Sequence, residues 1–241
     1  MNNKKSTHSF HIPVMGLAYT IDSPIRVAQY GISSVISIID DEIIEKMNRL
    51  YHQRNNFSYT EISNKVEDYR AKRITAYLDM VHEVVHQKGL QNLAEQKENF
   101  TENVLKFLEN HLSPGSIDVN VMTKVDKDNF VNGAQLPVIY NDAHVSLRGF
   151  ANSKLSSSIV LSAGMNPRLY SYFESFPDFF PNEKGELKKK IILKVSDFRS
   201  AMIQGNFFAK KGLRVSEYRV ESGLNCGGHA FATDGLLLGP I

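Results

Sequence analysis

Short apolar runs recur along the chain, separated by polar, turn-rich or helix-favouring segments. Each run is short enough for one strand and is apolar at most positions, a pattern typical of strands buried in a parallel sheet. About six such runs are present: IPVMGLAY, SSVISIID, SIDVNVMTKV, SSSIVLSAG, KKKIILKVSD and LRVSEYRVESG. LPVIYND is a candidate for one further short strand. Parallel strands need crossover connections, which are usually helical and right-handed, so the pattern predicts an α/β fold.

Helix signals fill two of the gaps between these runs. Asp22 or Ser23 can cap a short helix that carries Pro24 at its first position, and Gly31 is suited to end it. After the second run, residues 41–112 contain four charged, helix-favouring stretches, with NNFSYTEIS as a break between helices. We interpret 41–112 as a helical insertion within one domain that spans 1–241, and as a candidate lid, oligomer contact or partner surface.

Composition limits the class of protein. The chain has 241 residues, 42% of them hydrophobic, and a formal net charge of +2, which suits one globular domain and does not favour nucleic acid or an anionic membrane as a partner. Cys226 is the sole cysteine, so the chain has no internal disulfide and a reducing compartment is expected. No uninterrupted apolar stretch reaches the roughly 18 residues of a membrane span. We therefore expect a cytoplasmic protein.

The segment HEVVHQKGLQN contains the zinc-peptidase pattern His-Glu-x-x-His, at His82, Glu83 and His86. On a helix, two histidines four residues apart can bind one metal while the glutamate deprotonates a metal-bound water. In the longer form of this motif a third histidine follows, but that position is Asn92 here. A zinc hydrolase is therefore an alternative that the letters alone leave open.

Helical periodicity argues against that alternative. With residues 74–86 on a helix, the apolar stripe consists of Ile74, Tyr77, Leu78, Val81, Val84 and Val85. Asp79, His82, Glu83 and His86 then fall on the flank and the opposite face, which predicts a solvated position. Gly89 has a simpler role as a helix C-cap.

The segment ESGLNCGGHAF follows the last strand-like run, and ligands are handled at the carboxyl ends of parallel strands. Gly227 and Gly228 allow a ligand to approach the backbone, and their amides can face an electron-rich group. His229 has a pKa range suited to proton transfer. A tight turn followed by a helix would also explain these letters.

SGLNCGGH resembles the EGxEAGGH segment of nitronate monooxygenases and related flavin-dependent enoyl reductases. Further segments are similar to the family in the same order. PVMGLA is similar to the family's first strand, with Met15 and Gly16 at its methionine and first glycine. IDVNVMTKV is similar to a strand that carries a flavin-contacting asparagine, here Asn120, and SSIVLSAGMNP and KKKIILKVSDFRSAM are similar to the next two strands. Positions 222, 225 and 226 differ from the family pattern, which leaves the substrate open.

The resemblance implies a (β/α)₈ TIM-type barrel, incomplete at about six βα units and carrying the helical insertion after its second strand. It implies FMN at the carboxyl ends of the strands. It also implies a flavin-dependent oxidoreductase activity of the monooxygenase type on a small-molecule substrate, nitronate-like or related. His229 would transfer a proton beside the flavin, and the family's flavin-lining positions correspond to Met15, Gly16, Asn120, Gly227 and Gly228.

The last two strands of such a barrel would lie beyond Ile241. We therefore expect the 241-residue chain to be the N-terminal portion of a longer protein or a truncated gene product. We also expect it to bind FMN poorly and to aggregate readily. The other class left open is a noncatalytic partner protein that has kept the barrel shape without the flavin.

Overall fold

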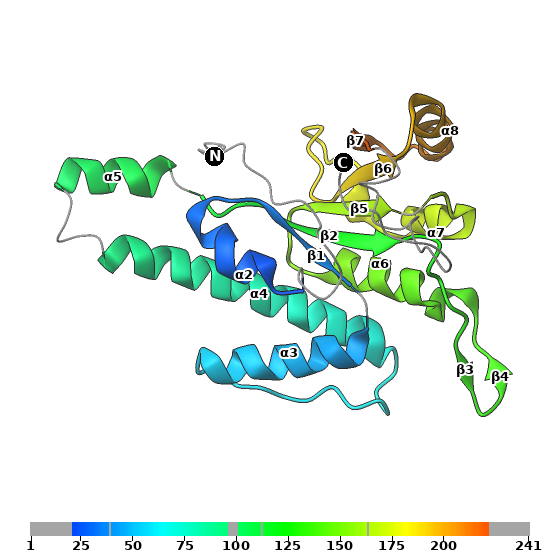
Figure 1. Cartoon of the computed structure of the whole chain (residues 1–241), viewed down its shortest axis with the longest axis horizontal. Coiled ribbons are helices and arrows are strands. Elements are labelled where there is room, and N and C mark those ends of the chain that lie inside the picture. Colours follow the sequence, from blue (N-terminus) through cyan, green and yellow to red (C-terminus); the bar gives the residue numbers. More distant parts are fainter. Residues whose placement is uncertain (1–20, 39, 96–100, 112, 163, 222–241) are drawn as a thin grey trace, which may run out of the picture.

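The computed structural model describes residues 21–221, except residues 39, 96–100, 112 and 163. Five strands form one sheet: β1 (Ser34–Ser37), β2 (Ile117–Met122), β5 (Ser158–Ser162), β6 (Lys190–Val195) and β7 (Val215–Val220). All neighbouring strands are parallel, and their order in the sheet is their order in the chain (Figure 1). The α/β fold and these five strands are confirmed, whereas IPVMGLAY lies outside the described residues.

The helices follow the strands as crossover connections. They are α2 (Ser23–Val27), α3 (Asp41–Arg54), α4 (Tyr69–Glu95), α5 (Glu102–His111), α6 (Asp142–Asn152), α7 (Pro167–Tyr172) and α8 (Phe198–Ala209), with 3₁₀ turns at Ala28–Tyr30, Val138–Tyr140, Phe173–Ser175 and Pro177–Phe179. Gly31 ends the first helical segment in the left-handed conformation, at φ 81°, as the sequence predicts. No described helix is both long enough and apolar enough to cross a membrane.

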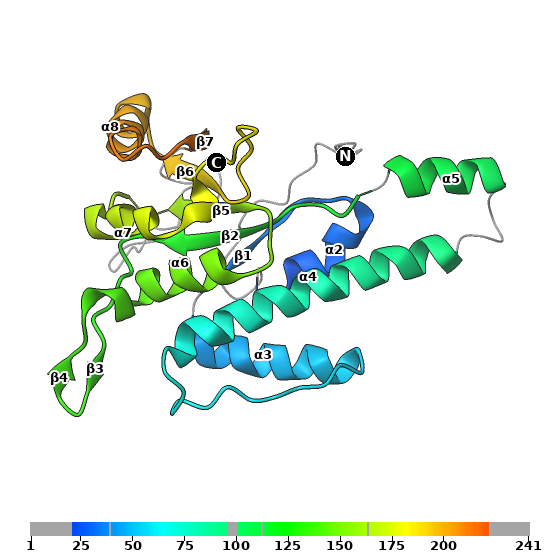
Figure 2. The same cartoon turned by 180° about the vertical axis from the view of Figure 1, so that it is seen from behind.

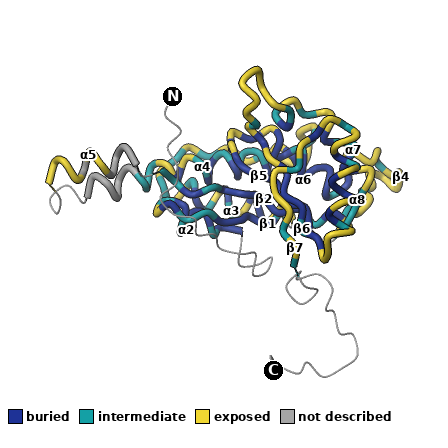
Figure 3. The backbone as a smooth tube through the Cα atoms, turned by 90° about the horizontal axis from the view of Figure 1, so that it is seen from above, coloured by how far each residue is buried: buried dark blue, intermediate teal, exposed yellow. Residues whose placement is uncertain are grey.

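One face of the sheet packs against the helices. A single core cluster contains Ile36, Val119, Ile159, Ile191 and Leu193 from the strands together with buried side chains of α2, α4, α6, α7 and α8. This arrangement is expected when successive right-handed crossovers all add strands in the same direction. In Figure 3 the buried residues concentrate in the sheet and in the inner sides of these helices.

The alternate residues of each strand point to the other face, which we call the second face. Its central row, set by the strand register, is Ser37, Asn120, Val160 and Ile192, all of them buried. This central row is thus apolar on β5 and β6 but polar where β1 and β2 meet.

The helical region 41–112 holds three described helices, not the four stretches that the sequence predicts. Its central helix, α4, packs against α3 and α6 below β1 and β2, while α5 lies beyond the end of α4 (Figures 1 and 2). The predicted stripe of α4 is confirmed, because Ile74, Tyr77, Leu78, Val81, Val84 and Val85 are all buried. The predicted C-cap at Gly89 is wrong, since α4 continues through it to Glu95. One internal glycine costs a helix only about 1 kcal/mol, which the long buried stripe outweighs.

An ion-pair network joins the insertion to the rest of the fold. Arg70 binds Asp41 of α3 at 2.8 Å and Asp142 of α6 at 2.7 Å. Arg73 binds the same Asp41 at 2.9 Å. Tyr77 also donates a hydrogen bond to the Ile21 carbonyl at 2.7 Å. The insertion is therefore part of the core structure.

A small hairpin was not predicted. It pairs β3 (Phe130–Val131) with β4 (Ala134–Gln135), and its turn residues Asn132 and Gly133 have φ values of 51° and 78°. Asn-Gly is the usual signal for such a turn. The strand predicted for LPVIYND is wrong, because Val138–Tyr140 forms a 3₁₀ turn. Pro137 lacks the amide donor that a strand needs at that point.

Candidate functional site

The polar part of the second face contains Asn120, the only sequence-predicted flavin residue within the described chain. Met15, Gly16, Gly227, Gly228 and His229 lie outside the described residues, so the structure does not place them beside Asn120.

Asn120 lies on β2 and is paired in register with Ser37, the last residue of β1. Asn120 is 3% exposed and Ser37 is fully buried. Within the described part of the chain, neither Asn120 Oδ1 nor Ser37 Oγ has a hydrogen-bond partner. Buried polar atoms are rarely left unpaired, because each one costs roughly 1–3 kcal/mol. Two neighbouring unpaired atoms therefore mark a place suited to a polar ligand.

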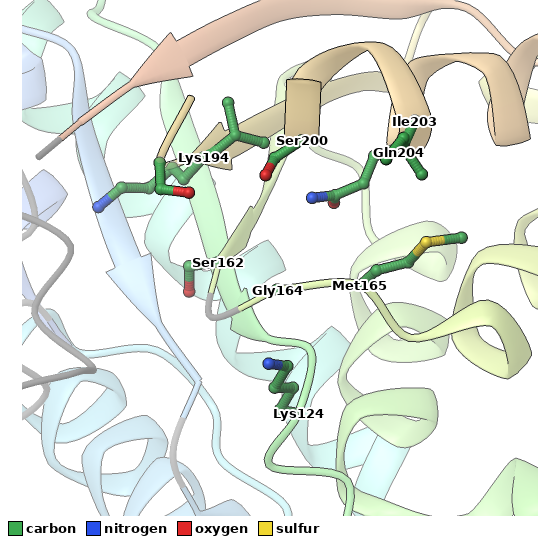
Figure 4. Close-up of a pocket in the computed structure, with 10 residues that line it drawn as sticks. Lys124, Ser162, Gly164, Met165, Lys194, Ser200, Ile203 and Gln204 are labelled. Atoms are coloured by element: carbon green, nitrogen blue, oxygen red, sulfur yellow. The ribbon is translucent and has the colours of Figure 1, made fainter. Parts of the chain in front are cut away.

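A second feature opens at the carboxyl ends of β2, β5 and β6 (Figure 4). It is a cavity of about 320 Å³, which we call the edge pocket, lined by Lys124, Ser162, Gly164, Met165, Lys194, Val195, Ser196, Ser200, Ile203 and Gln204. This is the position where open parallel sheets and barrels alike bind ligands.

The two lysines of the edge pocket differ in their partners. Lys194 lies on β6 with its side chain only 10% exposed, and its Nζ is 2.9 Å from a carboxylate oxygen of Glu221, just after β7. Lys124 follows β2 and is exposed, and no described carboxylate lies within ion-pair distance of it. Lys194 is thus neutralised, while Lys124 brings an uncompensated positive charge.

Gly164 determines where the Lys124 side chain can lie. Its φ is 97°, a backbone conformation that side chains disfavour. A Cβ at this position would lie 2.5 Å from Lys124 Cε and 2.9 Å from Lys124 Nζ. The missing side chain lets the end of the Lys124 side chain lie against the loop after β5, with its ammonium group directed toward Gly164 (Figure 4).

Gln204 supplies a buried polar group on the opposite wall. It is 7% exposed, and its Oε1 accepts a hydrogen bond from the Tyr170 hydroxyl at 2.5 Å. That bond leaves the Nε2 amide directed into the pocket (Figure 4). Burial raises the pKa of Tyr170, so its hydroxyl stays protonated and remains the donor.

A buried histidine and carboxylate hold the loops beneath the pocket. His144 is 1% exposed, and its Nδ1 lies 2.9 Å from Asp126 Oδ2. Asp126 also accepts hydrogen bonds from the Ala143 amide at 2.9 Å and from Asn166 Nδ2 at 3.1 Å. Burial raises the pKa of Asp126, but the hydrogen bonds, led by that of His144, outweigh burial and keep this pKa below its usual value. The pair fixes the loop after β2 to the starts of α6 and α7.

The zinc-motif residues are found on the outer side of α4, as the helical periodicity predicts. Glu83 and His86 are exposed and His82 is half-buried. The two imidazole rings are in contact, with centroids 4.3 Å apart. In the described ranges, no group of three histidine, cysteine, aspartate or glutamate side chains is arranged to hold a metal. Burial lowers the pKa of His82, and the neighbouring His86 lowers it further.

No protein-family model, curated protein or solved structure matches the chain. Function must therefore be inferred from the residues themselves. Sequence analysis nominated Asn120 but missed Lys124, Lys194 and Gln204. Lys124 and Ser196 could have been found from the sequence, because each is a polar residue at the carboxyl end of a strand-like run.

Proposed function

We propose that this chain is an FMN-dependent oxidoreductase of the nitronate monooxygenase type, built on a TIM-type barrel, that acts on a small-molecule substrate. The strand order supports the barrel. Five parallel strands in chain order, with their helices on one face, are the arrangement that a barrel uses, whereas doubly wound sheets reverse direction and cover both faces.

The observation that carries the proposal is the pair of unpaired polar atoms at Asn120 and Ser37. An isoalloxazine ring presents alternating carbonyl and N–H groups along its pyrimidine edge. A carboxamide can both donate to and accept from such an edge, and the Ser37 hydroxyl can do the same. The residues present on β1 and β2 therefore fit the polar edge of the flavin, and the apolar Val160 and Ile192 beside them fit its ring system.

The chain's own contribution would be binding and positioning. Asn120 and Ser37 would hold the polar edge of the ring, while buried apolar neighbours would keep water from it. When bound, the flavin supplies the electron transfer. By the resemblance stated above, His229 would move a proton at the substrate carbon.

A visible absorption spectrum of the purified protein tests the proposal. The supernatant of the heat-denatured protein is then examined for FMN. Because we expect the 241-residue chain to bind FMN poorly, it should show flavin bands only after incubation with FMN. The supernatant should then contain the released FMN. A colourless protein that gains no flavin bands after incubation with FMN would favour the noncatalytic partner protein.

Metal analysis of the same sample tests the zinc hydrolase. One equivalent of zinc that is lost in His86→Ala and kept in a His52→Ala control would favour the hydrolase and count against the flavin enzyme.

A further inference from the structure

We infer that the edge pocket is a binding site for a small organic carboxylate with a short apolar tail. This site goes beyond the proposed flavin function. It lies at the carboxyl ends of the strands, the end at which the resemblance places FMN, but its groups are different residues from Asn120 and Ser37, so carboxylate binding can be tested without flavin.

The charges of the pocket select a monoanion. Lys124 and Lys194 contribute two positive charges, and Glu221 cancels one of them at 2.9 Å from Lys194. Asp197 lies next to the pocket, but its carboxylate is bound to Ser196, to Ser200 and to the Ser200 amide. It is also exposed, so solvent screens its charge. One positive charge thus remains to attract a ligand.

The donors of the pocket match the two oxygens of a carboxylate. The hydroxyls of Ser196 and Ser200 already donate to Asp197, at 2.8 and 3.1 Å. The donors of the pocket that have no partner among the described residues are the ammonium of Lys124 and the Nε2 amide of Gln204, which both line it. They come from the loop after β2 and from α8 (Figure 4). The Nε2 amide of Gln204 has no acceptor in the described part of the chain and lines the pocket, so it is available to donate to a ligand oxygen.

The remaining walls indicate the rest of the ligand. Met165, Val195 and Ile203 give the pocket an apolar side. A cavity of about 320 Å³ is at the small end of the range for ligand sites, large enough for an acid of a few carbons. A phosphate dianion would need a second uncompensated cation and would leave the apolar side unused. A short-chain carboxylate uses both halves of the pocket.

Calorimetric titration of the purified chain with butyrate, in buffer without added flavin, tests this site. We expect saturable binding of butyrate. Lys124→Met should weaken it about tenfold, as expected for the loss of one charge-assisted hydrogen bond. Butyramide, which has the same shape without the charge, should bind about tenfold more weakly than butyrate.

Lys127→Met is the matched control, because Lys127 is an exposed lysine of the same loop that does not line the pocket. We expect its butyrate affinity to equal that of the unaltered chain. Far-UV circular dichroism should show the same fold for both variants.

Three results would overturn the inference: no saturable binding of butyrate, equal losses in Lys124→Met and Lys127→Met, or inorganic phosphate binding more tightly than butyrate. Absence of flavin from the protein would not affect it, so the two proposals can fail separately.

Discussion

Replacing Lys189 by methionine tests how the end of α6 is held. Lys189 is fully buried, and its Nζ donates to the carbonyls of Phe150 and Ser153 at 2.8 and 2.9 Å and to Ser153 Oγ at 3.1 Å. The ammonium also lies 4.3 Å from the centroid of the Phe150 ring. Carbonyls in the last turn of a helix have no partner inside the helix, so this lysine acts as the C-terminal cap of α6.

The expected cost follows from these contacts. Lys189→Met keeps most of the side-chain volume. The Phe150 carbonyl would still accept from the Ser153 amide at 3.1 Å and from the Ser153 hydroxyl at 2.7 Å. The Ser153 carbonyl would lose its donor, and one unpaired buried group costs about 1–3 kcal/mol. Near and below pH 7, where Lys189 is protonated, removing its buried charge would return part of that cost. We expect the free energy of unfolding to fall by about 2–3 kcal/mol above neutral pH.

The pH dependence gives the prediction a second, independent readout. Burial lowers the pKa of Lys189 from 10.5 to about 7. Between these two values the unfolded chain binds a proton that the folded chain does not, so stability rises with pH. Methionine does not titrate. The stability difference between the unaltered chain and Lys189→Met should therefore be larger near pH 9 than near pH 6, by up to about 1.4 kcal/mol per pH unit.

Urea unfolding followed by far-UV circular dichroism near both pH values measures the difference. Lys188→Met is the matched control, since Lys188 is exposed and paired with Asp178 on the surface, and it should change stability by less than about 0.5 kcal/mol. Equal stability of Lys189→Met and the unaltered chain, or a difference that does not grow with pH, would refute the reasoning.

Three further predictions concern the pH response and the pocket loop. In an NMR titration the pKa of His82 should lie below its usual 6.5 and should rise in His86→Gln, so an unchanged value would count against their contact. In urea unfolding, Asp126→Asn should lower the free energy of unfolding by about 2–4 kcal/mol near neutral pH and by progressively less as the pH falls below about 4. The reason is that the Asp126 carboxylate, whose pKa is low in the fold, stabilises the fold only while it is ionised. A stability difference between the two chains that stays constant with pH would contradict this. Gly164→Ala should lower the free energy of unfolding by about 1–2 kcal/mol. It should also displace Lys124 and so weaken butyrate binding in calorimetry; unchanged butyrate affinity would exclude the contact between residue 164 and Lys124.

Much of the fold could be predicted because its signals are local. The described strands except β7 are short, largely buried runs with apolar residues at their centres, and the buried side of α4 follows directly from helical periodicity. The same periodicity correctly placed Glu83 and His86 on the outer side of the helix. The errors have local causes as well. Gly89 resembled a cap, but the buried stripe before it holds α4 together beyond that point.

The candidate site was predicted only in part. Asn120 was nominated through the resemblance, and the structure adds that its Oδ1 lacks a partner within the described residues. Gln204 could not be found from sequence, because its direction depends on Tyr170, which is 34 residues away. Lys124 and Gly164 likewise come together only when β2 and β5 are aligned side by side. Contacts of this kind require the strand order, which periodicity does not provide.

Titration of the chain with FMN, followed by quenching of flavin fluorescence, tests the central claim most directly. We expect weak but saturable quenching, and a loss of affinity of about tenfold in Asn120→Ala, where the buried carboxamide is removed. Asn152→Ala, which removes an exposed asparagine at the end of α6, is the control and should bind FMN as the unaltered chain does. No saturable quenching, or the same affinity in Asn120→Ala as in Asn152→Ala, would contradict a flavin site on β1 and β2.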